Sequence, residues 1–319
     1  MTSLPSAKPS TGSHVVRHEA APRSRSGLRG AVERDAGRDA VSPTEAWAVA
    51  GLPVLGALAL LAAFAVHRTS MYWVLREDHP VEWTQFSLCA IASLVAAATA
   101  LRCAARREYG TAVLLLLVAV TCFGLAGEEI SWAQRVFNLA EPAELATVNK
   151  QAELNLHNTD VDGIAFDDLF KIFSFLMGAG GVTLALLARG PRPVLGGRFW
   201  WQVAPPLFTI PGFLAMALYR PFMLVVPAEL NAPVTAFQEW VEFSLYLSLV
   251  ATLICVYRRS TDGRSQLDVD ARRWVLTSGD GGSSLPFLAA VVLPVALVTV
   301  AFATLTVHFG IVPGNVVQP

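Results

Sequence analysis

The sequence predicts an all-α integral membrane protein with about seven transmembrane helices, and three observations lead to this fold class. Of its 319 residues, 54% are hydrophobic and 15% are charged, which is too apolar for an ordinary soluble domain. Seven apolar runs reach the length of roughly 20 residues that a helix needs to cross a bilayer. Arginines gather in alternate loops between these runs. The net charge of −1 gives no indication of nucleic-acid binding.

The N-terminal segment differs in composition from the rest of the chain. Residues 1–42 are rich in Ser, Pro, Gly, Ala and Arg and almost free of large apolar residues, so they are expected to form a disordered cytoplasmic tail. They lack the pattern of a cleaved signal peptide, and the first apolar run is expected to remain as an anchor. We expect a membrane domain over residues 43–309 and a short outer tail over 310–319.

The predicted spans are apolar runs of similar length: 45–66, 83–102, 111–132, 164–188, 202–226, 234–257 and 285–308. The fifth run contains Pro205, Pro206, Pro211 and Pro221, which predicts a kinked or broken helix. The four cysteines lie in or beside these runs without CxxC spacing, which favours buried thiols over disulfides or a zinc site.

The distribution of arginine predicts the orientation. The tail and the loops after spans two, four and six are rich in arginine, whereas the other loops are poor in it. The positive-inside rule then places the N-terminus inside and the C-terminus outside, in a multi-pass protein of the cell membrane. All seven spans are needed to keep this alternation.

This orientation brings charged residues from distant parts of the sequence to the outer side. The set comprises Arg76, Glu82, Glu128, Glu129, Asp167, Asp168, Lys171, Arg220, Glu239 and Glu242. Spans two and six also begin with the same pattern, Glu-Trp-x-(Gln/Glu)-Phe, at Glu82 and at Glu239. This similarity is either the remnant of a repeat or chance. The co-location predicts a polar site at the outer face.

Glu128 and Glu129 end the third span. On a continuing helix, Glu128, Ser131, Trp132 and Arg135 would share one face. An acid at bilayer depth costs roughly 2.5–3.5 kcal/mol and usually faces the protein interior or a wet cavity. The alternative is that both glutamates are interfacial and paired with Arg135 or Lys150.

The loop between spans three and four carries polar residues at alternate positions, namely Asn149, Gln151, Glu153, Asn155 and His157. An extended segment would place all five on one face, whereas a helix would align Asn149, Glu153 and His157. Pro142 suits a helix start, so we expect a short amphipathic or re-entrant helix that turns back against the bundle. The alternative is a hydrogen-bonded outer cap without chemistry.

These residues can be assigned candidate roles. The catalytic candidates are Glu128, Glu129, Glu153 and His157. A divalent cation is a possible cofactor, because carboxylates with a histidine suit a hard or borderline metal; its candidate ligands are Glu82, Glu128, Glu153, His157, Glu239 and Glu242. The candidate substrate-binding residues are Arg76, Trp132, Arg135, Asn149, Gln151, Asn155 and Arg220. The Glu-x-x-x-His spacing departs from the Glu-x-x-His of carboxylate-bridged bundles.

Two stretches, GEEISWAQRVF and NKQAELNLHN, resemble a signature of multi-pass bacterial membrane proteins of unknown activity, GEEISWGQR followed by N-x-Q-x-E-x-N-L-H-N. The resemblance covers about 35 residues. Ala133 stands where the signature has glycine, which we interpret as slightly looser helix packing. The resemblance implies a bacterial membrane protein and marks the site, but it implies no activity.

Three functions remain open. The first is an enzyme that acts on a lipid or apolar small molecule at the outer face, with acid/base chemistry that burial among carboxylates would assist. The second is a cation- or proton-coupled transporter, favoured by paired glutamates, the broken fifth span and the small-residue run 178–181. The polar groups gather at one face rather than near the midplane, which disfavours it. The third is a non-catalytic partner or assembly subunit.

Overall fold

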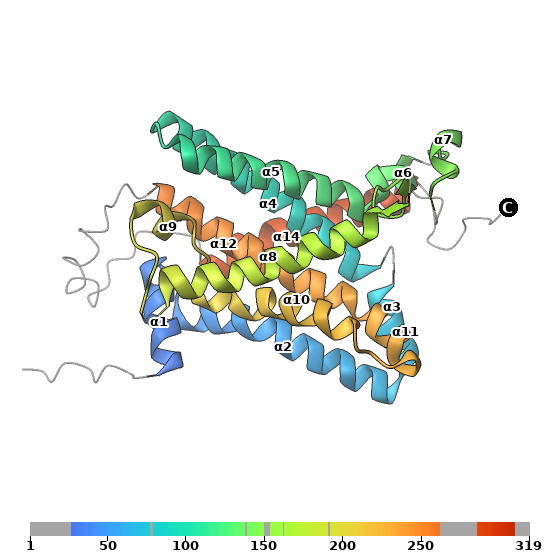
Figure 1. Cartoon of the computed structure of the whole chain (residues 1–319), viewed down its shortest axis with the longest axis horizontal. Helices are drawn as coiled ribbons and strands as arrows, with labels where there is room; N and C mark the ends of the chain where they lie inside the picture. Colours follow the sequence, from blue (N-terminus) through green and yellow to red (C-terminus); the bar gives the residue numbers. More distant parts are fainter. Residues whose placement is uncertain are drawn as a thin grey trace, which may run out of the picture.

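Long helices that run along one axis build the molecule (Figure 1). The computed structural model describes residues 27–76, 79–137, 139–149, 154–161, 163–190, 192–261 and 286–309. Gln151 and Glu153, two of the candidate site residues, lie outside this part of the chain, as do residues 1–26 and 310–319.

Five helical segments are long and apolar enough to cross a membrane. They are α2 (Pro43–Val66), α3 with α4 (Arg68–Leu75 and Pro80–Ala105), α5 (Tyr109–Glu129), α8 (Phe166–Arg189) and α11 with α12 (Ala228–Ala236 and Gln238–Thr261). Two further apolar helices are α10 (Ile210–Met223), which follows the 3-10 turn η2 (Leu207–Thr209), and α14 (Phe287–Phe309). The all-α membrane fold is confirmed, and each apolar run contains a helix; seven crossings remain a prediction.

Large apolar side chains cover the outside of these helices. Leu55 on α2, Val120 on α5, Leu176 on α8 and Leu297 on α14 are all exposed. Such a surface would be unfavourable in water and suits contact with lipid acyl chains. The chain is therefore a membrane protein whose long helices contact the bilayer.

The tail prediction is wrong for residues 28–42. Leu28–Arg38 form helix α1, whose Ala31, Val32 and Ala36 are buried in the main core. The next helix, α2, begins with a capping box in which Ser42 and Glu45 bond each other's backbone N–H groups. The segment folds because its few small apolar residues lie on one face and because its aspartates find buried partners, described below.

The fifth run is broken, as its prolines predicted. Helix α9 (Arg198–Val203) ends before Ala204, Pro205 and Pro206, and the chain resumes as η2 and α10. A proline has no N–H to donate and disfavours helical geometry in the residue before it, which accounts for the break.

Glycines allow α10 to approach its neighbours closely. A Cβ atom at Gly212 on α10 would collide with the Ser244 carbonyl of α12, and one at Gly178 on α8 would meet the backbone of α10 at Phe213. Gly178 and Gly181, within the small-residue run that was compatible with a transporter, therefore act in helix packing.

Short elements connect α5 to α8. They are the 3-10 turn η1 (Ser131–Ala133), α6 (Gln134–Phe137), α7 (Ala143–Ala146) and an antiparallel hairpin of β1 (Asp160–Val161) and β2 (Ile164–Ala165), in which Asp160 pairs with Ala165. Asn149 bridges to Thr159. The short helix expected to start near Pro142 is present as α7, but it ends at Ala146, and the described residues 154–157, which it was expected to include, are not helical.

Candidate functional site

A cavity of about 110 Å³ lies among α4, α5, α8, α10, α12 and the 154–158 segment. Its polar wall consists of Glu82, Glu128, Glu129, Asn155, His157, Asp167, Ser174, Arg220, Gln238, Glu239, Glu242 and Tyr246. Its apolar wall consists of Leu125, Phe170, Phe173 and Met177. The structure thus brings together most of the charged residues that were expected to share one end of the bundle, from five helices and one loop.

Several candidates are not part of this lining. Arg76 lies exposed at the end of α3, and Asn149 pairs with Thr159 outside the cavity. Trp132 does not line the cavity but donates a hydrogen bond to Glu128, which does. The side chain of Arg135 lies outside the described part of the chain.

Glu128 is a buried acceptor at the end of α5. Its Oε2 accepts the backbone N–H groups of Leu156, at 2.7 Å, and His157, at 3.1 Å, and lies 3.3 Å from His157 Nδ1. Its Oε1 accepts Trp132 Nε1–H at 2.9 Å. One carboxylate therefore fastens the 154–158 segment to α5 and orients the imidazole. These bonds also explain why the segment is not helical, since a helix would use the same N–H groups internally.

The expected helix face from Glu128 to Arg135 is wrong, although one of its contacts forms. Helix α5 ends at Glu129, and Ser131, Trp132 and Ala133 have φ angles of 45°, 51° and 62°. This left-handed turn folds the Trp132 ring back over Gly127, where a Cβ atom would collide with it. Trp132 reaches Glu128 through the turn instead of along a helix. Ala133 thus affects backbone strain rather than helix packing, which corrects our interpretation of that position.

Deeper in the cavity, polar side chains of α12 meet those of α5 and α10. Tyr246 donates its hydroxyl hydrogen to Glu129 Oε1 at 3.1 Å. Arg220 donates to Ser174 at 3.1 Å, and to Gln238 and Glu242 at 3.0 Å each. Its guanidinium is thus held in place and neutralises Glu242. The lining as a whole holds six carboxyl groups against this arginine, His157 and the neighbouring Lys171, whose Nζ lies 2.5 Å from Asp167, so carboxyl groups outnumber basic side chains.

The prediction of a metal site gains no support from the described residues. Within the part of the chain that the structure covers, no group of three or more His, Cys, Asp or Glu side chains could hold a metal ion. Glu128 and Glu242 bond to protein donors instead. Glu153, one of the expected ligands, is not in the covered part.

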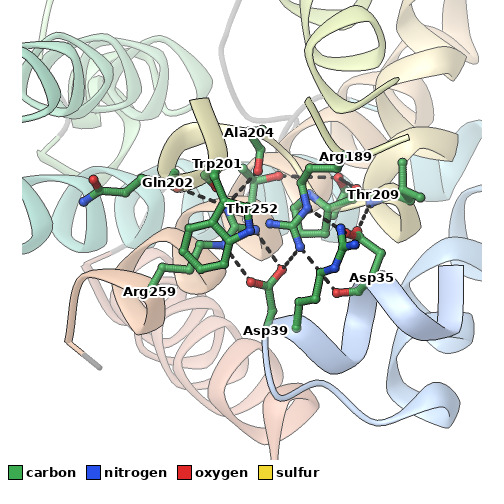
Figure 2. Close-up of polar contacts among 12 residues, drawn as sticks. Asp35, Asp39, Arg189, Trp201, Gln202, Ala204, Thr209, Thr252 and Arg259 are labelled. Atoms are coloured by element: carbon green, nitrogen blue, oxygen red, sulfur yellow. Dashed lines mark hydrogen bonds and ion pairs between the residues drawn. The ribbon is translucent and has the colours of Figure 1, made fainter. Parts of the chain in front are cut away.

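A second polar cluster, which sequence reasoning missed, lies at the opposite end of the bundle, near α1 and α9 (Figures 1 and 2). Arg189 donates to Asp35 and to Asp39, at 2.8 Å each. Arg259 donates to both oxygens of Asp39, at 2.6 and 2.7 Å. All four side chains are almost completely buried. We name this set the inner ion cluster.

The inner ion cluster also provides hydrogen-bond partners for backbone groups at the break in the fifth run. Arg259 donates to the carbonyl oxygens of Gln202 and Ala204, at 3.0 and 2.8 Å, and Asp35 accepts the Leu207 N–H at 2.8 Å. Burial alone would raise the pKa of the Asp39 carboxyl, but Arg189 and Arg259 outweigh this and hold the pKa below its usual range. The sequence did contain a signal for this cluster. Asp35 and Asp39 are four residues apart, so they would lie on the same side of a helix, beside a face of small apolar residues.

Comparisons with family models, curated proteins and solved structures give no match to this chain.

Proposed function

We propose that the chain is a membrane-embedded enzyme that performs acid/base chemistry on a lipid or another apolar small molecule. The single observation that carries the proposal is the Glu128–His157 pair at a cavity lined by both polar and apolar side chains. In the expected orientation, the site lies at the outer face of the cell membrane. The resemblance to bacterial membrane proteins agrees with this location.

In this proposal His157 is the general acid and base. A histidine changes its charge near neutral pH, and a carboxylate at one ring nitrogen fixes its orientation. Glu128 contacts Nδ1, so proton transfer to the substrate is assigned to Nε2. Glu128 acts as a positioning residue because its oxygens already accept three N–H groups, those of Leu156, His157 and Trp132.

The Glu129–Tyr246 pair supplies a second proton-exchanging group deeper in the cavity. Phe170, Phe173 and Met177 on α8 form the wall against which an apolar part of the substrate would lie. A lining that combines polar and apolar side chains suits a binding site for an amphipathic molecule. The chemistry is carried by side chains of this chain.

The test is turnover of lipids by the purified protein. The protein in detergent is incubated with a total lipid extract of its host membrane, and mass spectrometry follows every lipid class over time. We expect the wild type to convert one class. His157→Gln should lower the rate by about 100-fold or more, the usual contribution of a general acid or base.

The matched control is His67→Gln, which changes an exposed histidine between α2 and α3 that lies outside the cavity lining. This variant should turn over lipid at the wild-type rate. Unchanged lipid masses in the presence of the folded wild type would contradict the enzyme proposal.

A proton- or cation-coupled transporter is the second candidate, and the inner ion cluster favours it. This cluster buries four charges at the end of α8 and α12 opposite the acidic cavity and lies beside a broken helix, a common feature of transporters. Proteoliposomes with an internal pH dye would distinguish the two candidates. Solute-dependent proton flux without chemical conversion would support the transporter.

A further inference from the structure

We propose that the ligand of the cavity is a long-chain amphiphile with an ammonium headgroup, which enters sideways from the bilayer between α5 and α8. The inference rests on the proposed function, since it takes the cavity as the substrate site. It adds the chemical class of the substrate and its route.

The first step concerns the size of the cavity. About 110 Å³ holds a small headgroup, whereas pockets that enclose a whole drug-sized ligand measure roughly 300–1,000 Å³. The remainder of an amphiphile must therefore lie outside the cavity. Next to the cavity, the exposed surface of α8 is apolar at Leu169, Ile172 and Leu176, and such a surface suits contact with the acyl chains of the bilayer.

The second step concerns the side on which the cavity can open. Helices α5 and α8 both contribute to its wall, through Leu125 and Glu128 on α5 and through Phe170 and Phe173 on α8. Helix α5 packs along α4, and α8 packs along α10, but α5 and α8 have no extended contact with each other. His157 bridges the two helices at one point, where it contacts Glu128 on α5 and Phe170 on α8. Apart from this bridge, no extended helix-to-helix packing closes the cavity on this side.

Phe173 marks the opening. Its side chain lines the cavity and is nevertheless 41% exposed. It lies on α8, which is the least buried of the candidate spans. One side chain thus reaches from the cavity to the lipid-facing surface, and an alkyl chain can follow the same apolar path.

The third step concerns the charge of the headgroup. Six carboxyl groups line the cavity; Asp167 is paired with Lys171 Nζ at 2.5 Å, and Glu242 is paired with Arg220. The carboxyl groups still outnumber these two cations, and Arg220 is also bonded to Gln238 and Ser174. An anionic headgroup would meet repulsion, whereas an ammonium group offers three N–H donors to these acceptors. The aromatic rings of Phe170 and Tyr246 also favour a cation.

The experiment uses photolabelling of the full-length protein in phosphatidylcholine nanodiscs. The probe is dodecylamine with a diazirine on its chain, and mass spectrometry maps the labelled residues. We expect labels on α5 and α8 that excess dodecylamine removes and that dodecyl sulfate leaves in place. Labels on the lipid-facing surface of α2, at Leu55 and Leu58, should persist in both cases.

Variants test the two halves of the proposal separately. The double change Glu129→Gln and Glu239→Gln should reduce the removable labelling at least tenfold, whereas Glu144→Gln, on an exposed acid of α7, should not change it. Phe173→Trp fills the opening without altering the acidic wall, and it should also reduce labelling at least tenfold. A thermal unfolding scan of each variant confirms that it is folded.

Two outcomes would overturn the proposal. Equal competition by dodecyl sulfate would contradict the ammonium headgroup, and equal labelling of every lipid-facing helix without competition would contradict the site. The labelling experiment and the lipid-turnover experiment can fail independently of each other. Competed labelling without any lipid turnover would contradict the enzyme alone, and turnover of an amine-free lipid without competed labelling would contradict this inference alone.

Discussion

At the scale of single residues, the geometry of the site depends on Glu128. Its two oxygens accept hydrogen bonds from the Trp132 indole N–H and from the backbone N–H groups of Leu156 and His157, all within 3.1 Å. Hydrogen bonds to a charged group contribute about 1.5–3 kcal/mol each. A single side chain therefore holds a segment that would otherwise be an ordinary surface loop.

We predict that Glu128→Gln loosens this segment. A carboxamide has one acceptor oxygen, and its NH₂ group would face N–H donors. Amide hydrogen exchange at Leu156 and His157 should accelerate by about 10- to 100-fold, which corresponds to the loss of one such bond. Mass spectrometry of a peptide covering 154–159 measures the change. Glu144→Gln is the control, and unchanged protection in Glu128→Gln would show that backbone bonding alone orders the segment.

Ala133 carries strain that glycine would relieve. Its φ of 62° costs an L-residue about 1–2 kcal/mol, and part of this is offset by the greater chain entropy of glycine in the unfolded state. Ala133→Gly should therefore raise the free energy of unfolding in detergent by about 0.5–1 kcal/mol. Ala59→Gly, in the middle of α2, should lower it by about 1 kcal/mol. A loss of stability in Ala133→Gly would disprove the left-handed turn.

At the scale of elements, α1 joins the bundle through buried charges as well as through its small apolar face. Asp35 and Asp39 reach Arg189 at the end of α8 and Arg259 on α12, so one short helix links two long ones. Removing one partner from a buried pair commonly costs about 3–5 kcal/mol, because the other charge is left without compensation. The attachment of α1 is therefore sensitive to each of these charges.

The lowered pKa of Asp39 predicts how this attachment depends on pH. In the unfolded chain the pKa of this carboxyl is about 3.9, and in the folded chain the pKa is lower. The unfolded state thus binds more protons in this range. The stabilising contribution is complete above about pH 5 and is lost as the pH falls through the folded pKa. Thermal unfolding in detergent between pH 2 and 7 should show this loss in the wild type.

Asp39→Asn supplies the comparison. It should be less stable than the wild type at pH 7 by about 3–5 kcal/mol. Its unfolding temperature should change less between pH 5 and 3, because the titrating group is gone. A parallel decline of both proteins in acid would assign the pH dependence to other groups.

Elements differ in how far the sequence could predict them. Helices α2, α4, α5, α8 and α12 follow from runs of apolar residues, because hydrophobic length is a local property. The convergence of Glu82, Glu128, Glu239 and Glu242 also follows, because alternating helices place distant ends together. By contrast, α1 and the turn at 131–133 depend on tertiary partners: buried arginines in the first case, and the packing of Trp132 over Gly127 in the second.

At the scale of the whole molecule, two polar sites of opposite character occupy the two ends of the bundle. The cavity carries an excess of carboxyl groups, whereas the inner ion cluster pairs every charge in a closed set. Exposed arginines lie near the inner ion cluster: Arg102 contacts Tyr257, Arg106 donates to the Ser260 carbonyl beside Arg259, and Arg192 follows Arg189 by three residues. The positive-inside rule applied to the fold therefore predicts that this end is cytoplasmic and that the cavity is outside.

Cysteine labelling on intact cells tests this orientation with a membrane-impermeant maleimide. The four native cysteines are buried and give little background. Leu139→Cys, on the cavity side, should react at once, and Arg192→Cys should react only after permeabilisation. The two positions flank α8, whose 24 residues span about 36 Å, enough to separate them by a bilayer.

A third position decides whether the short helix α10 also crosses. Leu230 on α11 is exposed and follows η2 and α10, an apolar stretch from Leu207 to Met223. This stretch spans about 26 Å at helical rise, which is long enough to cross a thin or locally adapted bilayer, and we predict that it crosses. Leu230→Cys should therefore react from outside, as Leu139→Cys does. Reaction only after permeabilisation would make α10 a non-crossing helix, and the alternation of arginine-rich loops would then require fewer than seven spans.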